Sequence, residues 1–236
     1  MSAKKVKVKV TKKKIKVKNI LITGIILLLI ISTIIEVTKL PIKNIYIIGN
    51  QILSDKEIIE LAELNEYPPY LKIYFNNMKT KLLNNEYIKN VKIKRTISRK
   101  VYIEIEEYKP VCIYKDKLVL SSTKTVDNTY NIDFVPYIIN NVDEIYDKLI
   151  NKFNKIEDDI LLKISHIEYK PNEVDKERIL LYMTDSNYVY ITLSKIDKIN
   201  KYNSIIQKLE NKKGIIYLDS GDYVEIKGWH RKRDII

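Results

Sequence analysis

The side chains that could carry out chemistry are few and far apart in this chain. It has two histidines, His166 and His230, and one cysteine, Cys112. Zinc enzymes and serine or cysteine hydrolases are marked by close motifs, yet no H-E-x-x-H, paired-cysteine or G-x-S-x-G pattern is present. The neighbouring carboxylates Asp158-Asp159 and Glu106-Glu107 would point to opposite faces of a strand, which favours surface charge. We therefore expect no catalytic residue, no metal site, no cofactor and no small-molecule substrate.

The isolated histidine and cysteine have simpler interpretations than catalysis. His166 lies in a predicted strand between apolar residues, which favours a structural or exposed histidine. Cys112 follows Pro110 with no histidine nearby, so we predict a small, partly buried residue and no nucleophile. A single cysteine also excludes an internal disulfide.

An uncharged and almost wholly apolar run, Ile20 to Ile35, follows a tail with nine lysines and no acid. A helix extended to Thr38 approaches the ~30 Å of a bilayer's hydrocarbon core. Lysines beside a membrane helix stay in the cytoplasm, so the rest of the chain is expected outside. A cleaved signal peptide is the alternative, although Ser32 to Glu36 matches an A-x-A cleavage site poorly. We expect an uncleaved single-pass anchor.

Charge points away from nucleic acid. The formal net charge is +12, and the nine tail lysines account for most of it, leaving +3 after residue 18. The basic residues therefore set topology, and the outer part of the chain is nearly neutral.

The region after the anchor alternates between strand and helix patterns. Residues 42–48 favour a strand, Ser54-Asp55-Lys56-Glu57 is a capping box, and residues 76–83 favour a second short helix. Residues 91–94 and 101–106 alternate as two strands whose lysines and glutamates would face one another across an antiparallel pair. The predicted order is β-α-α-β-β.

The remainder predicts a second unit of mixed elements. Residues 142–153 follow an amphipathic helical pattern after Asn141 as a possible cap, and residues 178–183 and 188–193 favour a hairpin. Ser194 is expected to cap another helix, which Gly214 ends. Two strands, 215–218 and 222–227, should follow around Asp219-Ser220-Gly221.

Three stretches resemble the POTRA domain of the FtsQ/DivIB family. They are Ile45 to Asn50, Asn84 to Arg95 and Val101 to Val111, with Ile97-Ser98-Arg99-Lys100 standing where the family usually has a proline turn. The second unit is similar to the β domain of that family, so the resemblance covers essentially the whole chain. It implies an α+β fold with this division: a Lys-rich cytoplasmic tail (1–18), a transmembrane helix (19–38), a POTRA domain (40–108), a β domain with a largely antiparallel sheet (109–227) and a C-terminal tail (228–236).

The resemblance implies a non-catalytic organiser of the bacterial division septum. The implied partners are FtsL and DivIC, which is the counterpart of FtsB. Septal peptidoglycan synthases are further candidate partners. We expect a partner to add a strand to an exposed sheet edge near the C-terminus, with aromatic anchors, because unpaired backbone groups give register-specific binding. The candidate partner-binding residues are Tyr217, Leu218, Asp219, Ser220, Gly221, Tyr223, Val224, Glu225, Ile226 and Trp229.

Other roles stay open at this point. Tyr217 could instead be a core residue and Trp229 a tail residue, and the POTRA domain could be either a second docking surface or a spacer. The alternative functions are a membrane-anchored extracytoplasmic cell-wall enzyme and a POTRA-type chaperone or secretion component.

Overall fold

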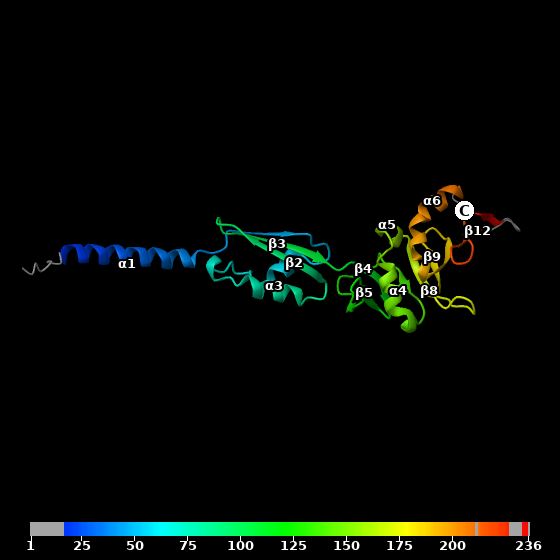
Figure 1. The fold of residues 1–236 in the computed structure, drawn as a ribbon, viewed down its shortest axis with the longest axis horizontal. Helices are drawn as coiled ribbons and strands as arrows, with labels where there is room; N and C mark the ends of the chain where they lie inside the picture. The colour runs from blue at the N-terminus through cyan, green and yellow to red at the C-terminus, as the bar shows by residue number, and fades with distance from the viewer. Residues whose placement is uncertain (1–16, 211, 227–232, 236) are drawn as a thin grey trace, which may run out of the picture.

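The computed structural model describes residues 17–210, 212–226 and 233–235. The molecule is elongated, with helix α1 at one end, a small sheet unit in the middle and a larger sheet unit at the other end (Figure 1). Helix α1 spans Val17–Lys39, and its side chains are exposed along nearly its whole length. Within the described part of the chain it is the one helix long and apolar enough to cross a membrane. It fits the predicted single membrane-spanning segment.

The middle unit has the predicted β-α-α-β-β order. Its strands form a three-stranded sheet in the order β1-β3-β2, in which β1 is parallel and β2 antiparallel to β3. The elements are β1 (Asn44–Ile48), α2 (Asp55–Leu61), the 3₁₀ helix η1 (Tyr70–Lys72), α3 (Phe75–Leu83), β2 (Ile88–Arg95) and β3 (Lys100–Glu107).

Local sequence signals explain where these elements begin and pair. Ser54 caps α2 through a capping box: its side chain accepts a hydrogen bond from the Glu57 backbone, and the Glu57 carboxylate accepts one from the Ser54 N–H at 2.8 Å. The predicted pairing of lysines with glutamates across the two strands is present as well, since Lys92 lies opposite Glu104 in the register of β2 and β3. Such exposed pairs contribute little individually, but they keep the wet face of the hairpin soluble.

Gly49 ends β1 in a conformation that other residues rarely adopt. Its φ is +93°, and a Cβ at this position would lie 2.3 Å from the carbonyl oxygen of Ile105. The close approach of the two backbones therefore requires glycine here.

The predicted surface position Glu107 has a structural role, which corrects the sequence-based interpretation. Its carboxylate accepts backbone hydrogen bonds from Gln51, Ile52 and Leu53 at 3.0, 2.7 and 3.0 Å. The loop after β1 is thereby fixed to the end of β3, whereas Glu106 remains an exposed partner of Lys89.

The described strands of the second unit form one ten-stranded sheet in the order β13-β12-β11-β10-β9-β8-β7-β4-β5-β6. It is largely antiparallel, as predicted, with parallel pairs at β10/β11, β4/β7 and β7/β8. The strands are β4 (Pro110–Tyr114), β5 (Lys117–Leu120), β6 (Thr125–Asp127), β7 (Tyr137–Ile138), β8 (Ile164–Tyr169), β9 (Arg178–Met183), β10 (Tyr188–Thr192), β11 (Gly214–Tyr217), β12 (Tyr223–Ile226) and β13 (Arg233–Ile235).

Helices pack their apolar residues onto this sheet to form the main core. The buried face of α4 contributes Leu149, Ile150 and Phe153, and Tyr202 of α6 is buried in the same cluster. The helices are η2 (Asp143–Ile145), α4 (Tyr146–Phe153), α5 (Asp158–Leu161), the 3₁₀ segment η3 (Leu193–Lys201) and α6 (Tyr202–Lys208).

Helix boundaries in this unit differ from the sequence-based prediction. The helical pattern over 142–153 divides into η2 and α4, with Asn141 accepting a hydrogen bond from the Asp143 N–H at 2.8 Å. Ser194 is not a cap, because η3 starts at Leu193 and has no side-chain cap bond. Gly214 does not end a helix either; it opens β11. Apolar periodicity located the buried faces but could not distinguish α from 3₁₀ turns.

Two hydrophobic cores meet at the hairpin of β4 and β5. Cys112 and Val119 face the core under the helices, whereas Ile113 and Leu118 face the core of the middle unit. The core of the middle unit therefore also includes residues well after position 108. Other members from this region are Leu120, Val126, Ile132 and Val135. The hairpin is therefore buried on both faces and couples the two units.

Candidate functional site

The predicted partner-binding residues lie on β11, on β12 and in the turn between them. Leu218 and Val224 are buried in the main core, while Tyr217 and Tyr223 lie on the opposite face of the sheet. Tyr217 is therefore not a core residue, which removes one of the two interpretations of that side chain. Trp229 lies outside the described residues.

Tyr217 is the middle ring of a stack of three tyrosines on adjacent strands. Its ring centroid lies 5.3 Å from that of Tyr190 on β10 and 4.6 Å from that of Tyr223 on β12, with interplanar angles of 17° and 14°. We call these three residues the tyrosine stack. Burial raises the pKa of Tyr217, so its hydroxyl stays protonated and remains a hydrogen-bond donor at physiological pH. Stacked rings on an open sheet face provide rigid apolar area at small entropic cost.

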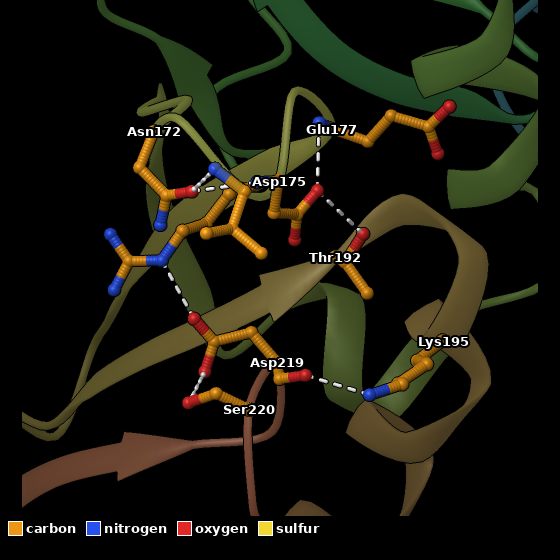
Figure 2. A network of polar contacts seen from close by, with 9 residues as sticks. Asn172, Asp175, Glu177, Thr192, Lys195, Asp219 and Ser220 are labelled. Carbon is orange, nitrogen blue, oxygen red and sulfur yellow. Dashed lines mark hydrogen bonds and ion pairs between the residues drawn. The ribbon is translucent and has the colours of Figure 1, made fainter.

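The turn after β11 is held by Asp219 (Figure 2). Its Oδ2 accepts a hydrogen bond from Arg178 Nε at 2.6 Å, and its backbone carbonyl accepts one from Lys195 Nζ at 2.7 Å. Ser220 Oγ lies 3.1 Å from the other carboxylate oxygen. The side chains of Asp219 and Arg178 are only 7% and 16% exposed, so this ion pair is shielded from water. The turn is therefore a fixed element of the sheet edge.

A second group of contacts in Figure 2 fixes the loop that leads into β9. Asn172 Oδ1 accepts the backbone N–H of Asp175 at 2.7 Å. One carboxylate oxygen of Asp175 accepts the N–H of Glu177 at 2.9 Å and the hydroxyl of Thr192 at 3.3 Å. The start of β9, which carries Arg178, is thus anchored to the end of β10.

Arg178 connects the turn with the tyrosine stack. Its guanidinium carbon lies 3.7 Å from the ring centroid of Tyr190, a cation–π contact, while its Nε binds Asp219. Neither Arg178 nor Tyr190 was among the residues predicted from sequence. Tyr190 could have been found, because alternation with the buried Val189 and Ile191 assigns it to the open face.

The open face carries a second row of rings beside the stack. Tyr137, His166, Tyr182 and Tyr188 contact one another in that order, with centroid separations of 6.1, 6.1 and 5.3 Å. Tyr182 donates to a carboxylate oxygen of Glu168 at 2.7 Å, and this bond together with burial raises the pKa of Tyr182 to about 12. His166 therefore lies at an exposed strand position among aromatic rings, in agreement with the sequence-based interpretation.

The sheet edge differs from expectation in one respect. We expected β12 to be the outer strand, but the short strand β13 pairs with it, placing Tyr223 opposite Ile235 and Glu225 opposite Arg233. On its other side, β12 approaches β11 so closely that a Cβ on Gly214 would lie 2.4 Å from the carbonyl oxygen of Glu225. The outer side of β12 is thus already paired within the chain.

The described residues near this site include few side chains that could act in catalysis or bind a metal ion. Within residues 17–210, 212–226 and 233–235, no three His, Cys, Asp or Glu side chains gather to hold a metal ion. Cys112 is fully buried, more so than predicted, and burial raises the pKa of its thiol far above the usual range. The C-terminal end of the sheet has a strand edge and an aromatic surface, and both features are used in protein–protein recognition.

One apolar helix, a β-α-α-β-β unit and a larger sheet with an aromatic face fit a single-pass membrane protein that carries a POTRA domain. The model of the FtsQ-type POTRA domain matches residues 40–108. The chain is 30% identical over 224 residues to cell division protein DivIB of Bacillus subtilis, covering 90% of this chain and 85% of the relative. It is 28% identical over 236 residues to DivIB of Bacillus anthracis, covering 96% of this chain and 89% of the relative.

The chain belongs to the DivIB family of bacterial cell division proteins. A solved structure of the major extracytoplasmic domain of the trans isomer of DivIB from Geobacillus stearothermophilus is also similar, with a TM-score of 0.38 and 18% identity. It covers 44% of this chain and 96% of that domain. The family assignment rests on the sequence relatives, and it gives this chain a role in cell division and partners within the division complex.

Proposed function

We propose that this protein is a non-catalytic organiser of the division septum that recruits and stabilises FtsL and DivIC. The Lys-rich tail lies in the cytoplasm, α1 crosses the membrane once, and the POTRA domain (40–108) and β domain (109–227) face outward. Family membership supports this arrangement, and so does α1, which is long and apolar enough to cross a membrane. The excess of lysines before α1 supports the direction of insertion.

The partner adds a strand at the C-terminal end of the sheet, with β12 as its template. The observation that carries this proposal is the tyrosine stack, which places Tyr223 of β12 in a row of rings on one face of the sheet. A partner strand would gain backbone hydrogen bonds from β12 and side-chain packing from Tyr223 and Tyr217. The fixed turn at Asp219 holds that template in one position.

The strand β13 adds a constraint, because it already occupies the outer side of β12. It has only three residues, and so few backbone pairs make a weak competitor for a longer incoming strand. In the proposed complex, the partner strand therefore replaces β13 beside β12. Trp229, which lies between β12 and β13 in sequence and outside the described residues, would then pack against the partner.

Binding of the outer segment of DivIC to the full chain in nanodiscs tests this mode. Tyr223→Pro removes a backbone donor from β12, and we expect binding to fall at least tenfold. Thr125→Pro is the matched control, because it places a proline in β6 at the opposite end of the same sheet. Trp229→Ala is expected to weaken binding on the order of tenfold, as loss of an aromatic anchor does.

Deletion of residues 233–236 distinguishes replacement of β13 from addition outside it. If the partner replaces β13, the shortened chain binds at least as tightly as the full chain. Loss of binding on this deletion, with Tyr223→Pro still binding normally, would refute β12 as the template. Incubation of the same preparations with purified peptidoglycan is expected to release no soluble fragments, and release would favour a cell-wall enzyme instead.

A further inference from the structure

The end of the POTRA domain nearest α1 carries exposed apolar side chains. Ile97, at the tip of the turn between β2 and β3, is fully exposed, and Leu71 of η1 is exposed as well. Turn tips are usually polar, so a β-branched apolar residue there needs an explanation. We call Val37, Leu40, Leu71 and Ile97 the apolar rim of this end.

This end is attached to α1 with no intervening linker. Tyr70 N–H donates to the carbonyl of Leu40 at 2.9 Å, and Arg99 Nη1 donates to the carbonyl of Pro41 at 3.0 Å. Lys43 N–H bonds the carbonyl of Arg99 at 2.9 Å, which holds the turn beside the start of β1. Figure 1 shows the β2–β3 turn at the end of the middle unit that faces α1. A bilayer spanned by α1 therefore reaches this end of the domain.

The apolar rim surrounds a hollow that joins the helix to the domain. Its volume is about 470 Å³, and it is lined by Val37 and Leu40 on the helix side and by Tyr70, Leu71 and residues of the β2–β3 turn on the other. The lining includes Arg95 and Arg99 but no acidic residue. The exposed apolar surface of α1 thus continues onto the domain and meets positive charge at its border.

Lipid is the occupant that this combination fits. At the edge of a bilayer, apolar side chains enter the boundary between headgroups and acyl chains, while arginines extend toward phosphate groups. Arg95 is exposed, and its guanidinium carbon lies 5.1 Å from the ring centroid of Phe75, a cation–π contact that leaves the charge at the surface. Continuity with the lipid-exposed helix favours the bilayer over a separate protein ligand.

We propose that the apolar rim of the POTRA domain docks on the outer surface of the bilayer that α1 spans. Ile97 and Leu71 enter the interface, and Arg95 and Arg99 lie against lipid phosphates. The domain then has a fixed orientation on the membrane and does not swing about Lys39. This inference goes beyond partner binding, which lies at the opposite end of the molecule.

Fluorescence of the full chain in vesicles tests the docking. Ile97→Cys is labelled with an environment-sensitive dye, since the native Cys112 is fully buried and does not compete for label. Val174→Cys is the matched control, because Val174 is 96% exposed but lies in the loop between β8 and β9 of the second unit. In vesicles of phosphatidylcholine and phosphatidylglycerol, the dye at position 97 should emit at shorter wavelength and be quenched by nitroxide-labelled lipid. The dye at position 174 should respond only to aqueous iodide.

Charge variants of the dye-labelled chain test the arginine contacts. Arg95→Gln should lower the ratio of docked to undocked protein roughly fivefold on vesicles with phosphatidylglycerol. On phosphatidylcholine alone, which has a phosphate group but no net charge, the reduction should be smaller. Lys92→Gln makes the same change of charge in the middle of β2 and should leave the ratio unchanged on both.

Two results would overturn the docking proposal. One is equal access of iodide to the dyes at 97 and 174. The other is protection of position 97 only when other division proteins are reconstituted with the chain, which would make the rim a protein-binding surface. Neither result bears on strand addition at β12.

Discussion

The shielded ion pair between Arg178 and Asp219 is expected to matter far more than the exposed pairs elsewhere in the chain. Asp219→Ala removes the acceptor of a 2.6 Å bond and leaves a guanidinium that is only 16% exposed without its carboxylate. Breaking a buried pair by removing one partner costs about 3–5 kcal/mol, and partial exposure places this case near about 3 kcal/mol. With a urea slope of about 2 kcal/mol per molar, the unfolding midpoint of the β domain should fall by about 1.5 M.

The measurement is urea unfolding of the full chain in mild detergent, followed by far-ultraviolet circular dichroism. The control is Lys94→Gln, which breaks the exposed pair with Glu104 and should cost no more than about 1 kcal/mol. The double variant Arg178→Met with Asp219→Ala should be less destabilised than Asp219→Ala alone, because no charge is left unpaired. If Asp219→Ala shifts the midpoint no more than Lys94→Gln does, the pair contributes nothing special and the reasoning is wrong.

Two further predictions concern the POTRA domain. Gly49→Ala should destabilise this domain by about 2 kcal/mol or more, because the new Cβ meets the carbonyl of Ile105. Thermal unfolding measures the loss. The control is Gly221→Ala, which should show no comparable loss because the nearest atom to its new Cβ lies 3.4 Å away. The bonds from Ser54 hold the pKa of Glu57 below its usual value, so the capping box stabilises α2 at neutral pH and that stability is lost as pH falls through the lowered pKa. Ser54→Ala should therefore cost about 1 kcal/mol at pH 7 and progressively less as Glu57 is protonated in acid, and a cost that stays constant through the titration of Glu57 would contradict the assignment.

Elements with strong local signals were predicted well. The capping box at Ser54 and the alternation in β2 and β3 depend on residues a few positions apart, so the sequence alone locates them. The same is true of the β9–β10 hairpin around Asp185. Local propensity and buried pattern agree in these segments, which is why their prediction succeeded.

Contacts between distant residues could not be predicted in this way. Arg178 and Asp219 are 41 positions apart, and Glu107 reaches the loop at Ile52 across 55 positions. A carboxylate beside other charges in sequence resembles surface charge until the fold brings backbone donors to it. The pairing of β13 with β12 could not be predicted either, because a strand of three residues is too short to show an alternating pattern in the sequence.

The doubly buried hairpin of β4 and β5 gives the two proposed surfaces a mechanical connection. Its residues are shared between the two cores, so the units cannot rotate about residue 108 without exposing Leu118 on one face or Val119 on the other. Exposure of even one such side chain costs about 1.5–3 kcal/mol, which disfavours free hinge motion at this point. Docking of the apolar rim on the bilayer would therefore also fix the direction in which β12 faces. Loosening the junction by Leu118→Ala should leave each surface intact yet weaken recruitment of a membrane-anchored partner more than binding of its soluble outer segment.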